Sequence, residues 1–182
     1  MSTKVEAIIE DLFKIKGKAE IVNGEIILFP PAGALPGYAA GEIFASLREY
    51  SRRRKIGHAV GANRAFVVNL PPIRSFSPNA AFYIGKIETK FLEGPPLFAV
   101  EVRNEADYGP YAECHIAQKR GDYFAAGTIV VWDVDLLSDD MVRVYRASDP
   151  LNPTIYHRGE IAEAEPAVPE WTMLVNELFP EW

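Results

Sequence analysis

Three segments carry apolar residues every three or four positions with polar residues between them, a pattern that predicts amphipathic helices. They are 3–16, 39–54 and 113–126, and a short closing helix is expected at 174–179. Gly17, Gly57 and Gly127 follow the three segments at positions where helices commonly end. Thr3 and Glu6 resemble a capping box at the start of the first one.

Shorter apolar runs between these segments predict strands. The runs are 19–22, 25–29, 64–70, 80–84, 97–102, 129–135, 141–146 and, as an edge strand, 154–158. Asn23-Gly24 joins the first two and is the strongest short signal for a hairpin. The run 97–102 is apolar enough to lie at the centre of a sheet.

The order of these elements predicts one α/β domain over 1–182, with a mixed β-sheet flanked by helices and with an N-terminal helix and β-hairpin. The segment 30–37 is expected to be a loop. The Ala/Glu/Pro-rich segment 160–169 is expected to be a mobile surface stretch.

Composition narrows the class of protein. With 48% hydrophobic residues in 182, the chain can bury a core, and disorder is excluded. Its apolar runs are too short to cross a bilayer, and 1–11 lacks the features of a secretory signal. We therefore expect a cytoplasmic protein that does not associate with a membrane. Cys114 is the single cysteine, which excludes an internal disulfide and a Cys-rich zinc site.

The net charge of −6 argues against a broad, non-specific nucleic-acid binder. One dense basic run, 52–55, stands at the end of a predicted helix. It has two interpretations: a solvated helix end that complements the helix dipole, or a contact with phosphate.

Common catalytic motifs are absent: the chain has no G-x-S-x-G elbow, no P-loop and no pair of histidines at i, i+4. His58, His115 and His157 are scattered. Cys114 and His115 are adjacent and point in different directions on a helix. A small-molecule hydrolase without any of these motifs remains a possible function.

Glu101 lies late in an otherwise apolar strand, where a buried charge is costly unless it is paired or binds a cation. Side chains alternate along a strand, so Glu101 and Arg103 share one face. A carboxylate on that face can bind Mg²⁺, while Arg103 stabilises the attacking water or the transition state. The alternative is a structural ion pair between Glu101 and a nearby Arg or Lys, such as Arg103.

Several short motifs occur in a fixed order along almost the whole chain. They are E-I-V-N-G-E at 20–25, P-N-A-A-F at 78–82, A-V-E-V at 99–102, Lys119 followed by Y-F-A-A-G at 123–127, V-W-D-V-D at 131–135, and E-L-F at 177–179. The ordered set resembles the PD-(D/E)XK nuclease superfamily, and within it the small stand-alone bacterial restriction endonuclease family. The resemblance implies that the single domain over 1–182 has a restriction-endonuclease-like mixed β-sheet flanked by helices.

The resemblance implies Mg²⁺-dependent, or Mn²⁺-dependent, hydrolysis of nucleic-acid phosphodiesters, with DNA as the expected nucleic acid. It makes Glu101 a metal ligand, the Val102 carbonyl a second one, Lys119 the cation that orients water, and Glu20 an outer carboxylate. It also implies a homodimer. The aromatic residues Trp171 and Trp182 would either form its interface or cover the core.

The chain departs from the family pattern at the metal site. Asn79 stands where the family has a metal-binding Asp, which removes one formal charge, so any metal is expected to bind weakly. Glu105 and Asp107 are candidates to replace that charge. Two functions follow: an endonuclease with an altered metal site, or an inactive nuclease-fold protein that binds nucleic acid or a protein partner.

Overall fold

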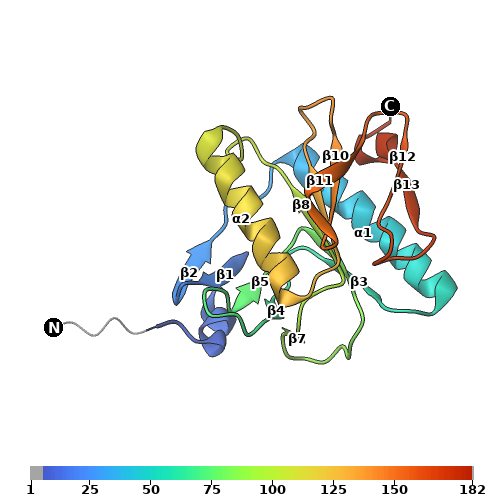
Figure 1. The fold of residues 1–182 in the computed structure, drawn as a ribbon. Helices are drawn as coiled ribbons and strands as arrows, with labels where there is room; N and C mark the ends of the chain where they lie inside the picture. Colours follow the sequence, from blue (N-terminus) through green and yellow to red (C-terminus); the bar gives the residue numbers. More distant parts are fainter. Residues whose placement is uncertain (1–5, 182) are drawn as a thin grey trace.

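The computed structural model describes residues 6–181, which fold around a six-stranded mixed sheet with strand order β11-β10-β9-β8-β6-β3 (Figure 1). The strands are β3 (His58–Gly61), β6 (Ala80–Tyr83), β8 (Phe98–Val102), β9 (Val130–Val134), β10 (Val142–Arg146) and β11 (Asp149–Tyr156). Strands β8 and β9 are parallel and the other neighbours are antiparallel. The predicted mixed α/β class and the central position of β8 are confirmed.

Two long helices cover opposite faces of this sheet (Figure 1). Helix α1 (Ala34–Arg54) packs with Phe98, Val100 and Val102, whereas Tyr123 of α2 (Pro110–Ala126) packs with Ala99 and Val131. The parallel pair β8 and β9 is joined through α2, as a βαβ unit requires.

Helix α1 begins within the segment 30–37, which was expected to be a loop. Pro36 lies in its first turn, where proline does not remove a helical hydrogen bond. The helix ends at Lys55, whose φ of 56° is left-handed, two residues before the predicted stop at Gly57. Gly57 is itself left-handed, in the turn that leads to β3.

The N-terminal hairpin is confirmed as β1 (Ala19–Val22) and β2 (Glu25–Leu28). Asn23 and Gly24 have φ of 50° and 72°, the two positive values that a tight hairpin turn of this type needs. The predicted first helix is wrong in kind and length: it is the 3-10 helix η1 (Ile9–Lys14). A cap exists one turn later than expected, because the Ile8 N–H donates to Asp11 at 3.1 Å; Thr3 lies outside the described residues.

Several short strands of the structure were not predicted from the sequence. The run 64–70 contains only β4 (Phe66–Val67), which pairs with β5 (Ser75–Phe76) and β7 (Leu92–Glu93) in a small separate sheet. Near the C-terminus β12 (Ile161–Glu163) pairs with β13 (Thr172–Leu174), and the 3-10 helix η2 (Val175–Leu178) follows. The prediction of a surface stretch at 160–169 is wrong, since Ala162, Ala164 and Ala167 are buried.

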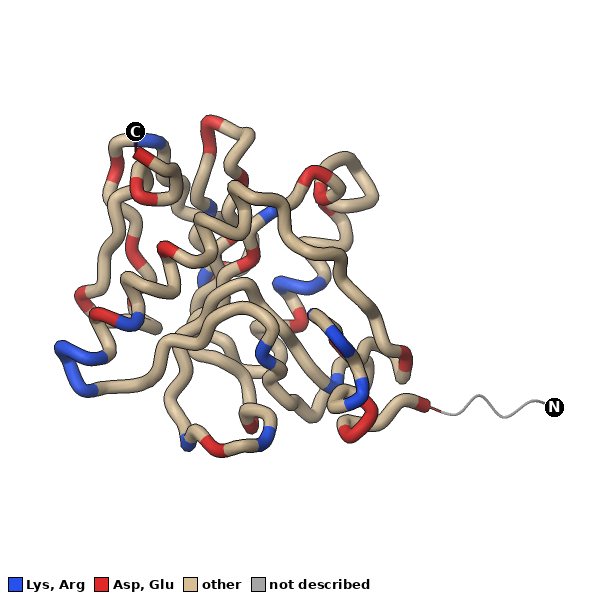
Figure 2. Tube along the Cα trace, turned by 180° about the vertical axis from the view of Figure 1, so that it is seen from behind, with Lys and Arg blue, Asp and Glu red and all other residues tan. Residues whose placement is uncertain are grey.

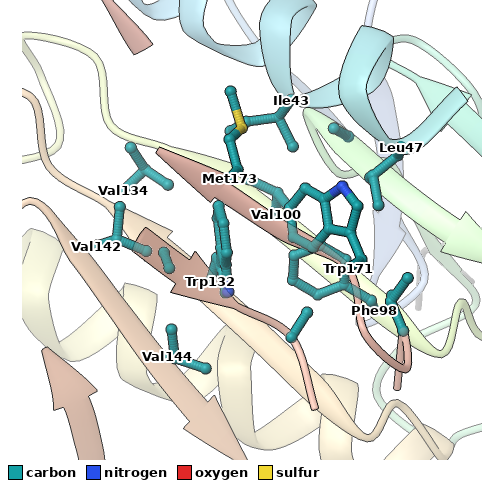
Figure 3. Close-up of a cluster of buried hydrophobic side chains, with 14 of the residues drawn as sticks. Ile43, Leu47, Phe98, Val100, Trp132, Val134, Val142, Val144, Trp171 and Met173 are labelled. Carbon is teal, nitrogen blue, oxygen red and sulfur yellow. The ribbon is translucent and has the colours of Figure 1, made fainter. Parts of the chain in front are cut away.

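The larger core cluster lies between α1, the sheet and the C-terminal segment (Figure 3). Trp171 is buried there, with its ring centroid 5.1 Å from that of Trp132. Trp171 therefore covers the core and offers no surface to a second chain, while Trp182 lies outside the described residues. The homodimer stays a prediction. Within 6–181, no helix combines the length and apolar character that crossing a bilayer requires.

Candidate active site

Glu101 and Lys119 meet at the face of the sheet that α2 covers. Alternation along β8 turns Val100 and Val102 toward α1 and leaves Glu101 on the opposite side, as the sequence predicted. Lys119 reaches from α2, and its Nζ lies 2.8 Å from Glu101 Oε1. This distance is that of a charge-assisted hydrogen bond.

Glu20 joins the same group from the N-terminal hairpin. Lys119 Nζ lies 2.9 Å from Glu20 Oε1, and this oxygen also accepts the Ser77 backbone N–H at 2.7 Å. Lys119 thus links a buried carboxylate, Glu20, to a partly buried one, Glu101, which is 81 residues away in sequence. Burial alone would lower the pKa of Lys119, but the two carboxylates outweigh it and raise that pKa, so Lys119 is a fixed cation.

The two oxygens of Glu101 have different surroundings. Oε1 accepts from Lys119 and from the Tyr123 hydroxyl, the latter at 2.7 Å. Oε2 faces Lys18, whose Nζ is 3.8 Å away. Burial raises the pKa of Glu101, but Lys119 and Lys18 outweigh this effect and hold that pKa below its usual value. Glu101 is therefore an anion, and its Oε2 has Lys18 as a charged neighbour at 3.8 Å but no hydrogen bond to it.

Asn79, the residue directly before β6, is hydrogen-bonded to the end of β8 beside Glu101. Its Oδ1 accepts the backbone N–H of Val102 at 3.0 Å, and its own N–H donates to the Val100 carbonyl at 2.9 Å. These bonds fix the Asn79 amide beside Glu101 at the end of β8. The Asn79 oxygen thus keeps one lone pair beyond its bond to Val102, but it lacks the charge that an Asp would bring.

Arg103 shares the Glu101 face but pairs with other residues. Its Nε and Nη2 donate to the two oxygens of Asp133 at 2.8 and 2.7 Å, and the remaining nitrogen contacts Glu113. Asp133 stands directly opposite Glu101 in the β8–β9 register. Glu101 therefore does not pair with Arg103. The ion-pair alternative holds in its general form, because Glu101 pairs with two lysines, Lys119 and Lys18.

These groups open onto a cavity of about 480 Å³. Its lining combines the charged and polar residues described above with apolar ones: Phe29, Pro30, Pro31, Ala32, Ala62 and Ile116. Of the two candidates for replacing the charge lost at Asn79, Asp107 lines the cavity and Glu105 does not. Asp107 Oδ2 is already bonded to the Asn104 N–H at 2.8 Å, so neither carboxylate joins Glu101.

The oxygen donors of this site fit a partly hydrated Mg²⁺ ion that also binds substrate phosphate, and they do not fit a cage made only of protein ligands. Among residues 6–181 no group of three or more His, Cys, Asp or Glu could hold a metal ion, so a cage made only of protein ligands is absent from this part of the chain. However, Mg²⁺ usually retains several waters and binds through one or two carboxylates together with substrate phosphates. Glu101 Oε2, the Asn79 amide oxygen and the Val102 carbonyl provide a donor set of that chemistry at the cavity.

Three residues of the site were missed, and two of them left a signal in the sequence. Lys18 precedes Glu20 by two positions on an extended segment and so shares its face. Tyr123 follows Lys119 by four positions on a helix and so shares its side. The third, Asp133, could be assigned only from the β8–β9 register, which the sequence does not reveal.

The mixed sheet and its two flanking helices form a nuclease-like fold, and Glu20, Lys119 and Glu101 are linked at one face of its sheet. The chain belongs to the Uma2 family, described as "Putative restriction endonuclease", whose model matches residues 9–176. Families of this type typically use divalent metals.

A solved structure of "a putative nuclease belonging to DUF820" from Anabaena variabilis ATCC 29413 has the same fold. The TM-score is 0.72 at 17% sequence identity, over 93% of this chain and 96% of that one. No curated protein matches the chain. The comparisons therefore support the recognised family and the nuclease-like fold.

Proposed function

We propose that the protein is an endonuclease that hydrolyses nucleic-acid phosphodiesters, with DNA as the expected substrate, in the cavity around Glu101. The observation that carries the proposal is the position of Lys119: its Nζ lies within 2.9 Å of both Glu20 and Glu101, and Lys119 and Glu101 line the cavity. A buried carboxylate and a fixed cation, open to a cavity, are what a phosphoryl-transfer site requires to position charge.

Each side chain then has a definite role. Lys119 orients the attacking water and stabilises charge that develops on the phosphate, because its raised pKa keeps it protonated. Glu20 and Tyr123 hold Lys119 and Glu101 in place through the contacts described above. Arg103 acts as a positioning residue, since its guanidinium is engaged by Asp133 and Glu113.

Glu101, Asn79 and the Val102 carbonyl would hold Mg²⁺ or Mn²⁺, with Glu20 as an outer carboxylate. When bound, such an ion supplies Lewis-acid activation of water and of the phosphate. Asn79 makes this site weak: one formal charge fewer beside a divalent ion costs about a few kcal/mol even when screened. We therefore expect slow hydrolysis with metal affinity well below that of an Asp-containing site.

An inactive, nucleic-acid-binding protein is the second candidate, and one observation favours it. The charged residues that line the cavity are five cations and three carboxylates: Lys16, Lys18, Arg103, Lys119 and Arg120 against Glu101, Asp107 and Asp133. This balance leaves no net negative charge to attract a divalent ion. Under this alternative the cavity binds the phosphate backbone without cutting it.

Cleavage and binding assays on the same variants separate the two. Single- and double-stranded DNA would be incubated with wild type, Glu101→Ala and Asn79→Asp in Mg²⁺ or Mn²⁺, and affinity would be followed by fluorescence anisotropy. We expect slow cutting by wild type, cutting faster by about tenfold or more in Asn79→Asp, and none in Glu101→Ala. Gln118→Glu, which adds the same charge at an exposed position of α2, should resemble wild type.

If neither wild type nor Asn79→Asp cuts, the endonuclease proposal fails. Retained DNA binding in that case would establish the binding protein. Loss of both would leave neither function standing.

A further inference from the structure

Lys18 is held loosely at the oxygen of Glu101 that the rest of the site leaves open. Its Nζ is 3.8 Å from Glu101 Oε2, beyond hydrogen-bond distance, whereas Lys119 approaches Oε1 at 2.8 Å. Within the described residues the Lys18 ammonium makes no hydrogen bond; the Phe29 ring centroid is 5.0 Å away, and the charges of Glu20, Asp107 and Lys119 act on Lys18 from nearby. All of its donors are thus available to another acceptor.

The position of Lys18 makes its charge important for any cation at Glu101. Its side chain is only 17% exposed, so water screens its charge poorly. A divalent ion on Glu101 Oε2 would occupy the space that this ammonium faces and would be repelled by it. Metal binding therefore requires Lys18 to move or to be neutralised.

Lys18 has both the freedom and the location to move toward a substrate. A lysine carries its charge on a flexible four-carbon stem, and both Lys16 and Lys18 line the cavity with Phe29 and Pro30. A phosphate that enters the cavity offers the acceptor oxygens that Lys18 lacks. Lys119, by contrast, is bound to two carboxylates and stays in place.

We propose that Lys18 is a resident counter-ion of Glu101 that transfers to a phosphate of the bound nucleic acid and thereby opens the divalent-metal position. Metal and nucleic acid then bind cooperatively: each raises the affinity of the other by the same factor, as thermodynamic linkage demands. This inference rests on the proposed function for the identity of the ligand, but it concerns binding and not cleavage.

Calorimetric titration with Mn²⁺ tests the coupling directly. Wild type would be titrated with and without a short single-stranded DNA whose phosphorothioate linkages resist cleavage, with the DNA alone as reference. We expect the DNA to tighten Mn²⁺ binding about tenfold, and Mn²⁺ to tighten DNA binding by the same factor in anisotropy.

Variants of Lys18 give the decisive comparison. Lys18→Met should bind Mn²⁺ about tenfold more tightly without DNA and should lose most of the coupling. Lys18→Arg, which retains the charge, should keep it. Lys16→Met is the matched control: it removes the same charge from the same cavity, but no ion pair joins Lys16 to Glu101 in the described residues. It should weaken DNA binding itself and leave the coupling factor equal to that of wild type. Thermal melts establish that each variant is folded, and Lys18→Gln replaces Lys18→Met if the latter is not.

Coupling that persists in the charge-removing Lys18 variant, or that is absent from wild type, would overturn the inference. The proposed function fails separately, through the cleavage assay. A protein that cuts DNA without coupling would contradict only the role of Lys18, and one that shows coupling without cutting would contradict only hydrolysis.

Discussion

Arg103 and Asp133 form a buried ion pair beside the candidate site. Their side chains are 5% and 3% exposed, and two parallel hydrogen bonds join them. Removing one partner of such a pair leaves an uncompensated buried charge, which typically costs about 3–5 kcal/mol. Arg103→Met is expected to lower the free energy of unfolding by about that amount, as measured by urea denaturation.

The exposed partner of Arg103 supplies the control. Glu113 is 54% exposed, so Glu113→Gln should cost only about 0–1 kcal/mol. Replacing both buried partners, in Arg103→Met with Asp133→Leu, should restore a large part of the loss, because no buried charge is then left unpaired. If Arg103→Met proves as mild as Glu113→Gln, the pair is not buried in the way described.

Glu113 also gives a prediction for pH. Its hydrogen bond with Arg103 outweighs the effect of burial and lowers the pKa of Glu113 below 4.5 in the folded protein. A carboxyl whose folded-state pKa is depressed adds stability above its unfolded pKa and loses it as the pH falls through the folded value. The difference in stability between wild type and Glu113→Gln should therefore be present at neutral pH and vanish in acid.

Urea unfolding of both proteins, repeated from pH 7 to about pH 3, measures that difference. A gap that widens on acidification would contradict the sign of the pKa shift.

The residues of the site differ in how far the sequence could identify them. Glu101 was found because a charge in an apolar strand needs a partner, and Glu20, Asn79, Val102 and Lys119 were added from the family resemblance. The structure brings all five to one end of β8. Their roles in catalysis and metal binding stay predictions. What the sequence could not supply is the partner of each charge, because partners depend on strand register and on side-chain reach.

At the scale of elements, two of the three long periodic segments were predicted well, whereas 3–16 was not, and the shortest strands were missed. Helices α1 and α2 and strands β8, β9 and β10 each repeat a pattern over several residues. Strands of two or three residues, such as β4, have too few positions to show alternation. The segment 160–169 was wrongly predicted for another reason. Its Ala/Glu/Pro-rich composition resembles a surface stretch, but its small alanine side chains pack in the same core cluster as Trp132 and Trp171.

Gly57 shows how one element constrains another. A Cβ added there would lie 2.3 Å from Cζ of Phe82, a fully buried side chain of β6, and the residue has a φ of 56°. Both the close contact and the left-handed backbone oppose any other residue. Gly57→Ala is expected to lower the free energy of unfolding by about 1–3 kcal/mol, measured by urea or thermal denaturation.

Gly41 provides the opposite case within α1. A Cβ at that position meets nothing within 4 Å. Because glycine inside a helix costs conformational entropy, Gly41→Ala should stabilise the protein by about 0.5–1 kcal/mol. Equal effects of the two substitutions would show that the close approach to Phe82 is not as the structure has it.

At the scale of the whole molecule, charge is distributed unevenly around a net value of −6 (Figure 2). One concentration of positive charge, Arg52–Arg54, is in the last turn of α1, where Arg54 pairs with Glu170 at 2.6 Å. Another group of cations, with Lys16 and Arg120 among them, lines the cavity. An acidic protein that binds nucleic acid must do so through one of these regions, with its remaining surface repelling the phosphate backbone.

Helix α1 separates the two regions. Pro31 and Ala32, which lead into its first turn, line the cavity, and its 21 residues extend over roughly 30 Å before Arg52–Arg54. This separation exceeds the Debye length of about 8 Å at physiological salt, so charges at one end hardly affect a phosphate at the other. If the basic run is only a solvated helix end, substitutions there should leave the affinity for nucleic acid at the cavity unchanged; if it contacts phosphate, they should weaken that affinity.

Charge reversal in each region distinguishes them, with a short single-stranded oligonucleotide as the ligand and fluorescence anisotropy as the measurement. Lys16→Glu with Arg120→Glu should weaken binding by about tenfold or more and reduce its salt dependence, because both side chains lie at the proposed phosphate path. Arg52→Glu with Arg53→Glu changes the net charge equally and should leave affinity within about twofold of wild type. If the α1 pair instead weakens binding as strongly, the basic run contacts phosphate itself, and nucleic acid must extend along α1 beyond the cavity.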